Sequence, residues 1–145
     1  MQETRITFTL NKLVSVLNSH ADSILRTKFD MTYSQFLFLL NLQAKPSSLT
    51  ELAGYLKVST AAVSKRVTWF TDRGLVEIVP DSTNARKVVL KITKRGEKSV
   101  QKASTQLEAS FNDFFAGYKG VKLGELNKNL NSVLEHLLEK PMETQ

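Results

Sequence analysis

The sequence contains no cysteine, only two histidines, and few of the residues that interrupt regular structure. Of its 145 residues, six are Gly and three are Pro. The absence of cysteine excludes disulfides, thiolate metal sites and cysteine-based redox sensing. The histidines, His20 and His136, are far apart and have no neighbouring clusters of carboxylates at ligand spacing, so we expect no metal and no cofactor.

Long apolar runs and targeting signals are also missing. No segment approaches the ~18 consecutive apolar residues that a membrane helix needs, and the polar, charged amino terminus does not resemble a signal peptide. The sequence has no nucleophile–base pair, Gly-rich phosphate loop or paired catalytic carboxylates. It therefore predicts a cytoplasmic protein that is not an enzyme and has no membrane partner.

Negative charge is scarce in one stretch of the chain. The formal net charge is +6 and the pI is about 9.6. Between Lys57 and Lys98, ten Lys and Arg face four Asp and Glu, so this stretch holds the whole surplus while the remainder is balanced. Such a concentration favours a polyanionic partner. On charge alone, a merely solvated basic face remains the alternative.

Most of the apolar pattern has helical period. A first helix is predicted from about Ile6 to Leu25. Thr32 is placed to cap a second helix, which is apolar on almost every side and therefore belongs at the centre of the domain. Ser48 or Thr50 can begin a third helix.

The fourth helix begins at Ser59, after a very short turn, and runs to about Arg73. Gly74 then stops it, as a glycine beyond a helix end commonly does. The pattern next changes to strand alternation in two segments, around Val76 and around Leu90, with turn formers between them. Two more helical stripes follow. The order α-α-α-α-β-β-α-α predicts a mainly helical fold with a small β-hairpin.

The third and fourth helices fit a helix-turn-helix. With 100° per residue, Val63, Val67 and Phe70 share the inner face of the fourth helix. The opposite face is small, polar and basic, and fits a major groove ~12 Å wide. The predicted DNA-contacting residues there, with the cap, are Ser59, Thr60, Ala61, Ser64, Lys65 and Thr68.

The predicted hairpin strengthens this interpretation because it follows the fourth helix directly. Its tip carries Arg86 and Lys87, which we also predict to contact double-stranded DNA, as in a winged helix whose hairpin reaches the neighbouring minor groove. A helical hairpin inside any core also has a small polar outer face. A winged-helix module for protein interaction and a sequence-tolerant DNA-binding protein therefore remain alternatives.

The segments TYSQFLFLL, LTELAGYLKVSTAAVSKRVTWFTDRGLVEIV, ARKVVLKIT and KRGEK resemble the MarR (multiple antibiotic resistance regulator) family of bacterial repressors. The resemblance extends in detail from Thr32 to about Lys98. It implies a homodimer with intertwined terminal helices. It also implies repression at a pseudo-palindromic operator, relieved by a small aromatic or amphipathic effector.

The resemblance divides the chain into a dimerisation helix (residues 1–31), a winged helix-turn-helix domain (32–98) and carboxy-terminal dimerisation helices (99–145). By position it makes Ser59, Thr60, Ser64 and Lys65 groove contacts and Arg86 the wing-tip residue. It places an effector pocket beside the first, second and fifth helices. The candidate lining residues there are Leu17, His20, Tyr33 and Phe36, although aromatics at helical spacing more often belong to a core.

Two positions depart from the family pattern. Asn84 stands where the family usually has Asp, which leaves open whether the wing is looser or is held by Asp81 instead. Arg66 occupies a usually apolar position, where it either extends toward a DNA phosphate or loosens the local packing. We count Arg66 among the predicted DNA contacts.

The terminal apolar stripes also argue for a dimer without the resemblance. Together with the first helix they present more apolar surface than a small three-helix domain can cover. Packing of these helices against each other within one chain is the alternative. A two-fold dimer would place two recognition helices one DNA turn apart, ~34 Å, on a pseudo-palindromic site.

Overall fold

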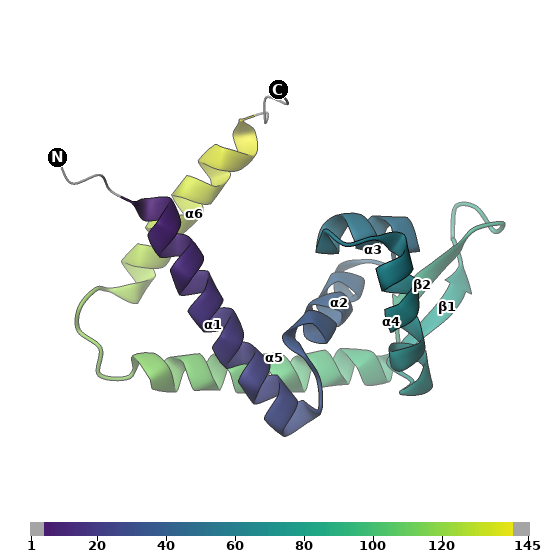
Figure 1. Ribbon diagram of the computed structural model, residues 1–145, viewed down its shortest axis with the longest axis horizontal. Coiled ribbons are helices and arrows are strands. Elements are labelled where there is room, and N and C mark those ends of the chain that lie inside the picture. The colour runs from purple at the N-terminus through teal and green to yellow at the C-terminus, as the bar shows by residue number, and fades with distance from the viewer. Residues whose placement is uncertain (1–4, 141–145) are drawn as a thin grey trace. The chain divides into compact units, whose positions relative to one another are not determined.

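The computed structural model describes residues 5–140. Its elements are α1 (Ile6–Phe29), α2 (Tyr33–Ala44), α3 (Leu49–Leu56), α4 (Thr60–Asp72), β1 (Val76–Pro80), β2 (Val88–Ile92), α5 (Lys94–Phe115) and α6 (Leu123–Glu139) (Figure 1). The predicted element order is confirmed. Two compact units are present, Met1–Ala109 and Ser110–Gln145. The finer division at residues 31 and 98 stays a prediction.

Side-chain caps fix where three of the helices begin. Thr32 accepts a hydrogen bond from the Gln35 N–H at 3.0 Å, and the Gln35 side chain accepts from the Thr32 N–H at 2.8 Å. Ser48 and Glu51 form the same reciprocal arrangement before α3. These caps satisfy N–H groups that have no partner inside a helix. Thr32 was expected in this role, and Ser48 rather than Thr50 is the second cap.

The helix α2 forms the centre of the first unit, as its apolar sequence predicts. Phe38, Leu39 and Leu42 are almost completely buried. The ring of Phe38 stacks on Phe70 of α4, with centroids 4.1 Å apart and planes inclined by 10°. This contact ties α4 to the core through its inner face.

The two strands form an antiparallel hairpin, hereafter the wing, with a register from Val76↔Ile92 to Pro80↔Val88. The buried residue Ser47 pairs with Leu90 through two backbone hydrogen bonds of 3.0 and 2.8 Å, so the loop before α3 extends the sheet. The expected alternation is only partly right, because Ile78 and Val88 are 56% and 60% exposed. Both line an open hollow between this hairpin and α4.

The chain passes from the wing to α5 through a close approach. A Cβ on Gly96 would overlap the carbonyl oxygen of Leu75, so the first turn of α5 requires glycine there. The Thr93 hydroxyl donates to the Gly74 carbonyl at 2.6 Å and accepts from the Gly96 N–H at 3.0 Å. Gly74 has φ +67°, a left-handed conformation that glycine adopts without strain.

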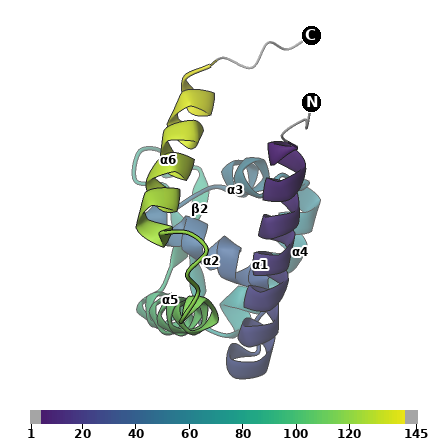
Figure 2. The same cartoon turned by 90° about the vertical axis from the view of Figure 1, so that its left-hand side faces the viewer.

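The outer helices leave apolar side chains exposed. The helix α1 is unbroken (Figure 2) and runs four residues beyond the predicted end, to Phe29. Its buried residues, Ala21 and Leu25, lie in its second half, whereas Phe8 is 64% exposed. In the second unit, α6 has no buried residue at all, although its apolar positions recur at helical spacing.

Candidate nucleic-acid interface

The helix α4 has the two faces that its sequence predicts. Val63, Val67 and Phe70 are buried against the core. Thr60, Ala61, Ser64, Lys65 and Thr68 are all exposed. The outward face therefore carries short side chains, hydroxyl groups and one ammonium group, which is a suitable combination for contact with base edges and phosphates in a groove.

Ser59 caps this helix, as predicted. Its hydroxyl oxygen accepts from the Ala62 N–H at 3.1 Å. The positive end of the helix dipole and the unpaired N–H groups of the first turn lie at this same end. An anion such as a DNA phosphate is stabilised there.

The turn between α3 and α4 sets the angle between the two helices. Lys57 adopts a left-handed conformation with φ 54°, and the Val58 N–H donates to the Ala53 carbonyl at 3.0 Å. Ala53 is 6% exposed. A larger side chain at Ala53 would therefore push the two helices apart.

Hydrogen bonds hold the tip of the wing in a defined turn. The Lys87 N–H donates to the Asn84 carbonyl at 2.9 Å, and the Arg86 N–H donates to the Asn84 side chain at 3.1 Å. The Asp81 carboxylate accepts from the N–H and the hydroxyl of Thr83, and these bonds lower its pKa below the ordinary value. Asp81 and Asn84 therefore both order the tip, and the Asp-to-Asn departure does not leave it without side-chain support.

The cations of this surface are available to a partner. Lys65, Arg86 and Lys87 are exposed, and none forms an ion pair within residues 5–140. They carry positive charge on α4 and on the adjacent wing, so the surface is positive where the helix and the wing would meet the same duplex.

Arg66 lies elsewhere on α4. Its side chain is half-buried, and its Nη1 donates to the hydroxyl of Ser34, on α2, at 3.0 Å. The arginine therefore links α4 to α2 and does not belong to the exposed face of Thr60 and Ser64. A phosphate contact by Arg66 stays a prediction.

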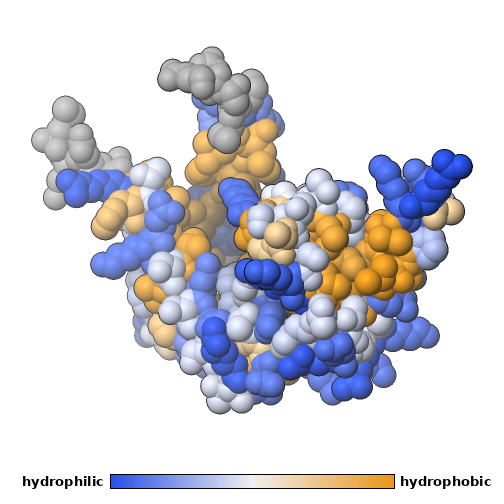
Figure 3. All heavy atoms as spheres, turned by 45° about the vertical axis from the view of Figure 1, so that its right-hand side comes forward, coloured by the Kyte–Doolittle hydropathy of each residue, from blue (hydrophilic) through white to orange (hydrophobic). Residues whose placement is uncertain are grey.

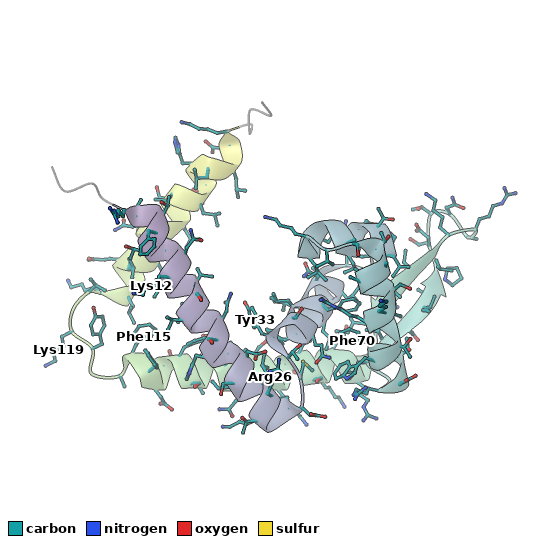
Figure 4. All side chains as sticks on the ribbon, in the orientation of Figure 1. Lys12, Arg26, Tyr33, Phe70, Phe115 and Lys119 are labelled. Atoms are coloured by element: carbon teal, nitrogen blue, oxygen red, sulfur yellow. The ribbon has the colours of Figure 1, made fainter. Side chains whose placement is uncertain are left out.

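The four candidate effector residues lie on α1 (Leu17 and His20) and on α2 (Tyr33 and Phe36). Leu17, His20 and Tyr33 are half-buried and Phe36 is buried. The Tyr33 N–H donates to Asp22 of α1 at 2.8 Å; Figure 4 shows Tyr33 at the start of α2. The role of the four residues in effector binding stays a prediction.

Sequence reasoning missed an apolar hollow of about 250 Å³ between α4 and the wing. Ile78, Val88 and Leu49 line it together with Ser64 and Thr68. Figure 3 shows an apolar patch here, below the hydrophilic wing tip. The apolar residues of the two strands were the available signal, but alternation alone does not show which of them a helix covers.

Comparison with known protein families gives one match. The sequence model described as "MarR family" matches residues 29–87. Residues 29–87 thus match a MarR-family domain. This match confirms the resemblance recognised in the sequence. The MarR family consists of transcriptional regulators rather than enzymes, in agreement with the prediction of no enzymatic activity.

Solved structures show that the MarR fold extends over nearly the whole chain. The transcriptional regulator BldR from Sulfolobus solfataricus is 24% identical, with a TM-score of 0.74 over 94% of this chain and 99% of that one. A MarR family protein from Bacillus stearothermophilus is 17% identical, with a TM-score of 0.78 over 96% and 100%. CouR from Rhodococcus jostii RHA1, bound to p-coumaroyl-CoA, is 14% identical, with a TM-score of 0.75 over 99% and 100%. No curated protein sequence matches the chain.

Two further observations concern the described residues, 5–140. No three His, Asp or Glu side chains gather there in a way that could hold a metal ion. None of the helices is both long enough and apolar enough to cross a membrane.

Proposed function

We propose that the protein is a cytoplasmic transcriptional repressor that binds a pseudo-palindromic operator as a homodimer and is released by a small ligand. The observation that carries this proposal is the exposed face of α4, with Ser59 at its positive end and the cations of the wing tip beside it. In this arrangement α4 enters the major groove and Arg86 contacts the adjacent backbone or minor groove.

Exposed apolar side chains on the outer helices support a homodimer. On α1, Ile6, Phe8 and Val14 are between 51% and 64% exposed. On α6, Leu130, Leu134 and Leu137 are between 37% and 62% exposed. A soluble protein rarely leaves so much apolar surface in water, and a second copy of the chain would cover it. The dimer would then present two copies of α4 to one duplex.

Release by a ligand rests on the family and on one relative. CouR was solved with p-coumaroyl-CoA bound. We retain Leu17, His20, Tyr33 and Phe36 as candidate contacts for a small aromatic or amphipathic effector.

Paired substitutions on α4 and on the wing test the proposal. We expect Lys65→Ala to weaken operator binding by about 1–3 kcal/mol and to relax specificity at one base pair. Arg86→Ala should weaken binding to all duplexes about equally. Lys119→Ala removes an exposed cation outside the winged domain, and serves as the charge-matched control. Gel-shift titrations measure the affinity of all three variants for a site selected from random duplex DNA and for an unrelated duplex.

The same titrations contain the outcomes that contradict the proposal. If Lys65→Ala and Arg86→Ala both bind the operator as tightly as the parent protein, α4 and the wing do not form the DNA interface. If binding to duplex does not change between low and moderate salt, phosphate neutralisation contributes nothing. The second result would favour a protein-interaction module.

A further inference from the structure

A hollow of about 480 Å³ lies at the carboxyl end of α4, within the first unit. Its lining comes from the α1–α2 junction, from the end of α4 and from the first turns of α5. The residues that decide its chemistry are Asp30, Trp69, Arg73, Arg95, Lys98 and Lys102. The proposed DNA interface uses none of them.

The hollow is strongly positive. Four of its side chains are cations and one, Asp30, is a carboxylate. Arg95, Lys98 and Lys102 are spaced by three and four residues, so they project from one face of α5. None of the four cations forms an ion pair with a carboxylate within residues 5–140. Like charges gathered in this way repel one another, and a bound anion would relieve that repulsion.

An aromatic ring stands beside these charges. The Arg73 guanidinium lies 3.9 Å from the centre of the Trp69 ring, and its Nη1 donates to the Trp69 carbonyl at 3.1 Å. These contacts fix the guanidinium while leaving further N–H groups for an anion. Met31 and Leu75, both buried, contribute apolar lining. The hollow thus offers apolar and aromatic surface together with a cationic rim.

DNA binding at the other end of α4 does not account for this charge. The helix has 13 residues, so about 20 Å separates its Ser59 end from Arg73. Figure 1 shows α5 beginning near the end of α4 and the tip of the wing extending away from that end.

We propose that this hollow binds a planar aromatic ligand with two or more negative charges, of the nucleoside polyphosphate class. One arginine fork is sufficient for a single carboxylate, whereas four cations on long side chains suit a chain of phosphates. The Arg73 guanidinium, which lies on the Trp69 ring, offers a planar surface on which a base can stack. The volume lies within the ~300–1,000 Å³ that is usual for small-molecule sites.

Trp69 makes the site directly observable, because it is the single tryptophan of the protein. We expect titration with ADP to change its fluorescence saturably. Arg95→Ala and Lys102→Ala should each weaken binding about fivefold or more, the usual scale for losing one charge-assisted contact. Lys94→Ala is the matched control, since Lys94 is an adjacent exposed cation that does not line this hollow. All three side chains are exposed, and circular dichroism verifies that the variants fold.

Three simpler compounds determine which part of the ligand is recognised. Pyrophosphate and adenosine should each bind more weakly than ADP, and benzoate should bind more weakly still. If pyrophosphate or adenosine binds as tightly as ADP, the proposed two-part recognition is wrong. Absence of saturable binding by both fluorescence and calorimetry, or equal weakening by Lys94→Ala, also overturns the proposal. No DNA is needed for these titrations, so their failure is separate from failure of the proposed repressor function.

Discussion

The helices α4 and α6 are both amphipathic and have similar lengths, 13 and 17 residues. They differ in how far their apolar side chains are buried. Val63 and Phe70 on α4 are completely buried in the first unit, whereas no residue of α6 is buried. The apolar side of α4 finds its partner within the same chain. The apolar side of α6 stays exposed within residues 5–140, and from this difference we infer a second copy of the chain.

The largest expected effect comes from a charge placed on α6. Leu130→Glu should raise the dissociation constant of the dimer more than 100-fold, about 3 kcal/mol, because an unpaired carboxylate would be buried in the interface. Asn129→Asp adds the same charge at the adjacent position and should have little effect. Sedimentation equilibrium measures both. A Leu130→Glu protein that remains as dimeric as the parent protein would place α6 outside the interface.

Substitutions at two glycines test how tightly the first unit is packed. Gly96→Ala forces a methyl group against the Leu75 carbonyl, and should destabilise the fold by about 1–3 kcal/mol. Gly54→Ala, in α3, has nothing within 4 Å of the added methyl group and should stabilise by about 0.5–1 kcal/mol. Urea unfolding gives both values. Equal effects of the two substitutions would show that the Leu75 contact imposes no constraint.

Two substitutions of the α4 cap, Ser59, distinguish its effect on stability from its effect on DNA binding. Ser59→Ala should cost about 1 kcal/mol of stability through loss of the bond to the Ala62 N–H. Ser59→Asp should retain the stability, since Asp also caps helices, but should lose DNA affinity by repelling phosphate. Thermal unfolding and gel-shift titration are measured on the same samples. DNA binding by Ser59→Asp at the parent level would remove this end of α4 from the interface.

The smallest effect concerns the junction of α1 and α2. The Tyr33 N–H, and then Arg26, hold the pKa of Asp22 below its ordinary value of 3.8. Because the folded state prefers the ionised form, this carboxylate stabilises the fold above pH 3.8, and the stabilisation is lost as pH falls through the lowered pKa. Asp22→Asn should therefore be less stable than the parent protein at pH 7, and the difference should shrink below pH 3.8.

Denaturant midpoints at neutral and acidic pH measure this change. Asp113→Asn removes an exposed carboxylate that forms no ion pair within residues 5–140, and it is the control. A stability difference for Asp22→Asn that is the same at both pH values would contradict the assignment.

Local signals in the sequence predict the helix caps and the inner face of α4. Thr32 and Ser59 were recognised as caps because each hydroxyl residue stands directly before an apolar helical pattern. Val63, Val67 and Phe70 were assigned to the inner face of α4 from spacing alone. These properties depend on neighbouring residues, so they can be deduced without knowing the tertiary structure.

Such local signals fail where the outcome depends on distant residues. Ile78 and Val88 look buried by alternation, but whether a strand face is covered depends on which helix lies over it. The bond from Arg66 to Ser34 joins positions 32 residues apart. The hollow at the end of α4 is assembled from three separate segments, and no spacing within one of them indicates it.

Selection of bound sites from random duplex DNA tests the central claim most directly, namely that two copies of the exposed face of α4 bind one operator. The account predicts enrichment of a two-fold symmetric motif whose half-sites are about one helical turn, ~10 base pairs, apart. Lys65→Ala should relax one position in each half-site. Recovery of no motif, or of a single half-site without symmetry, would contradict the account.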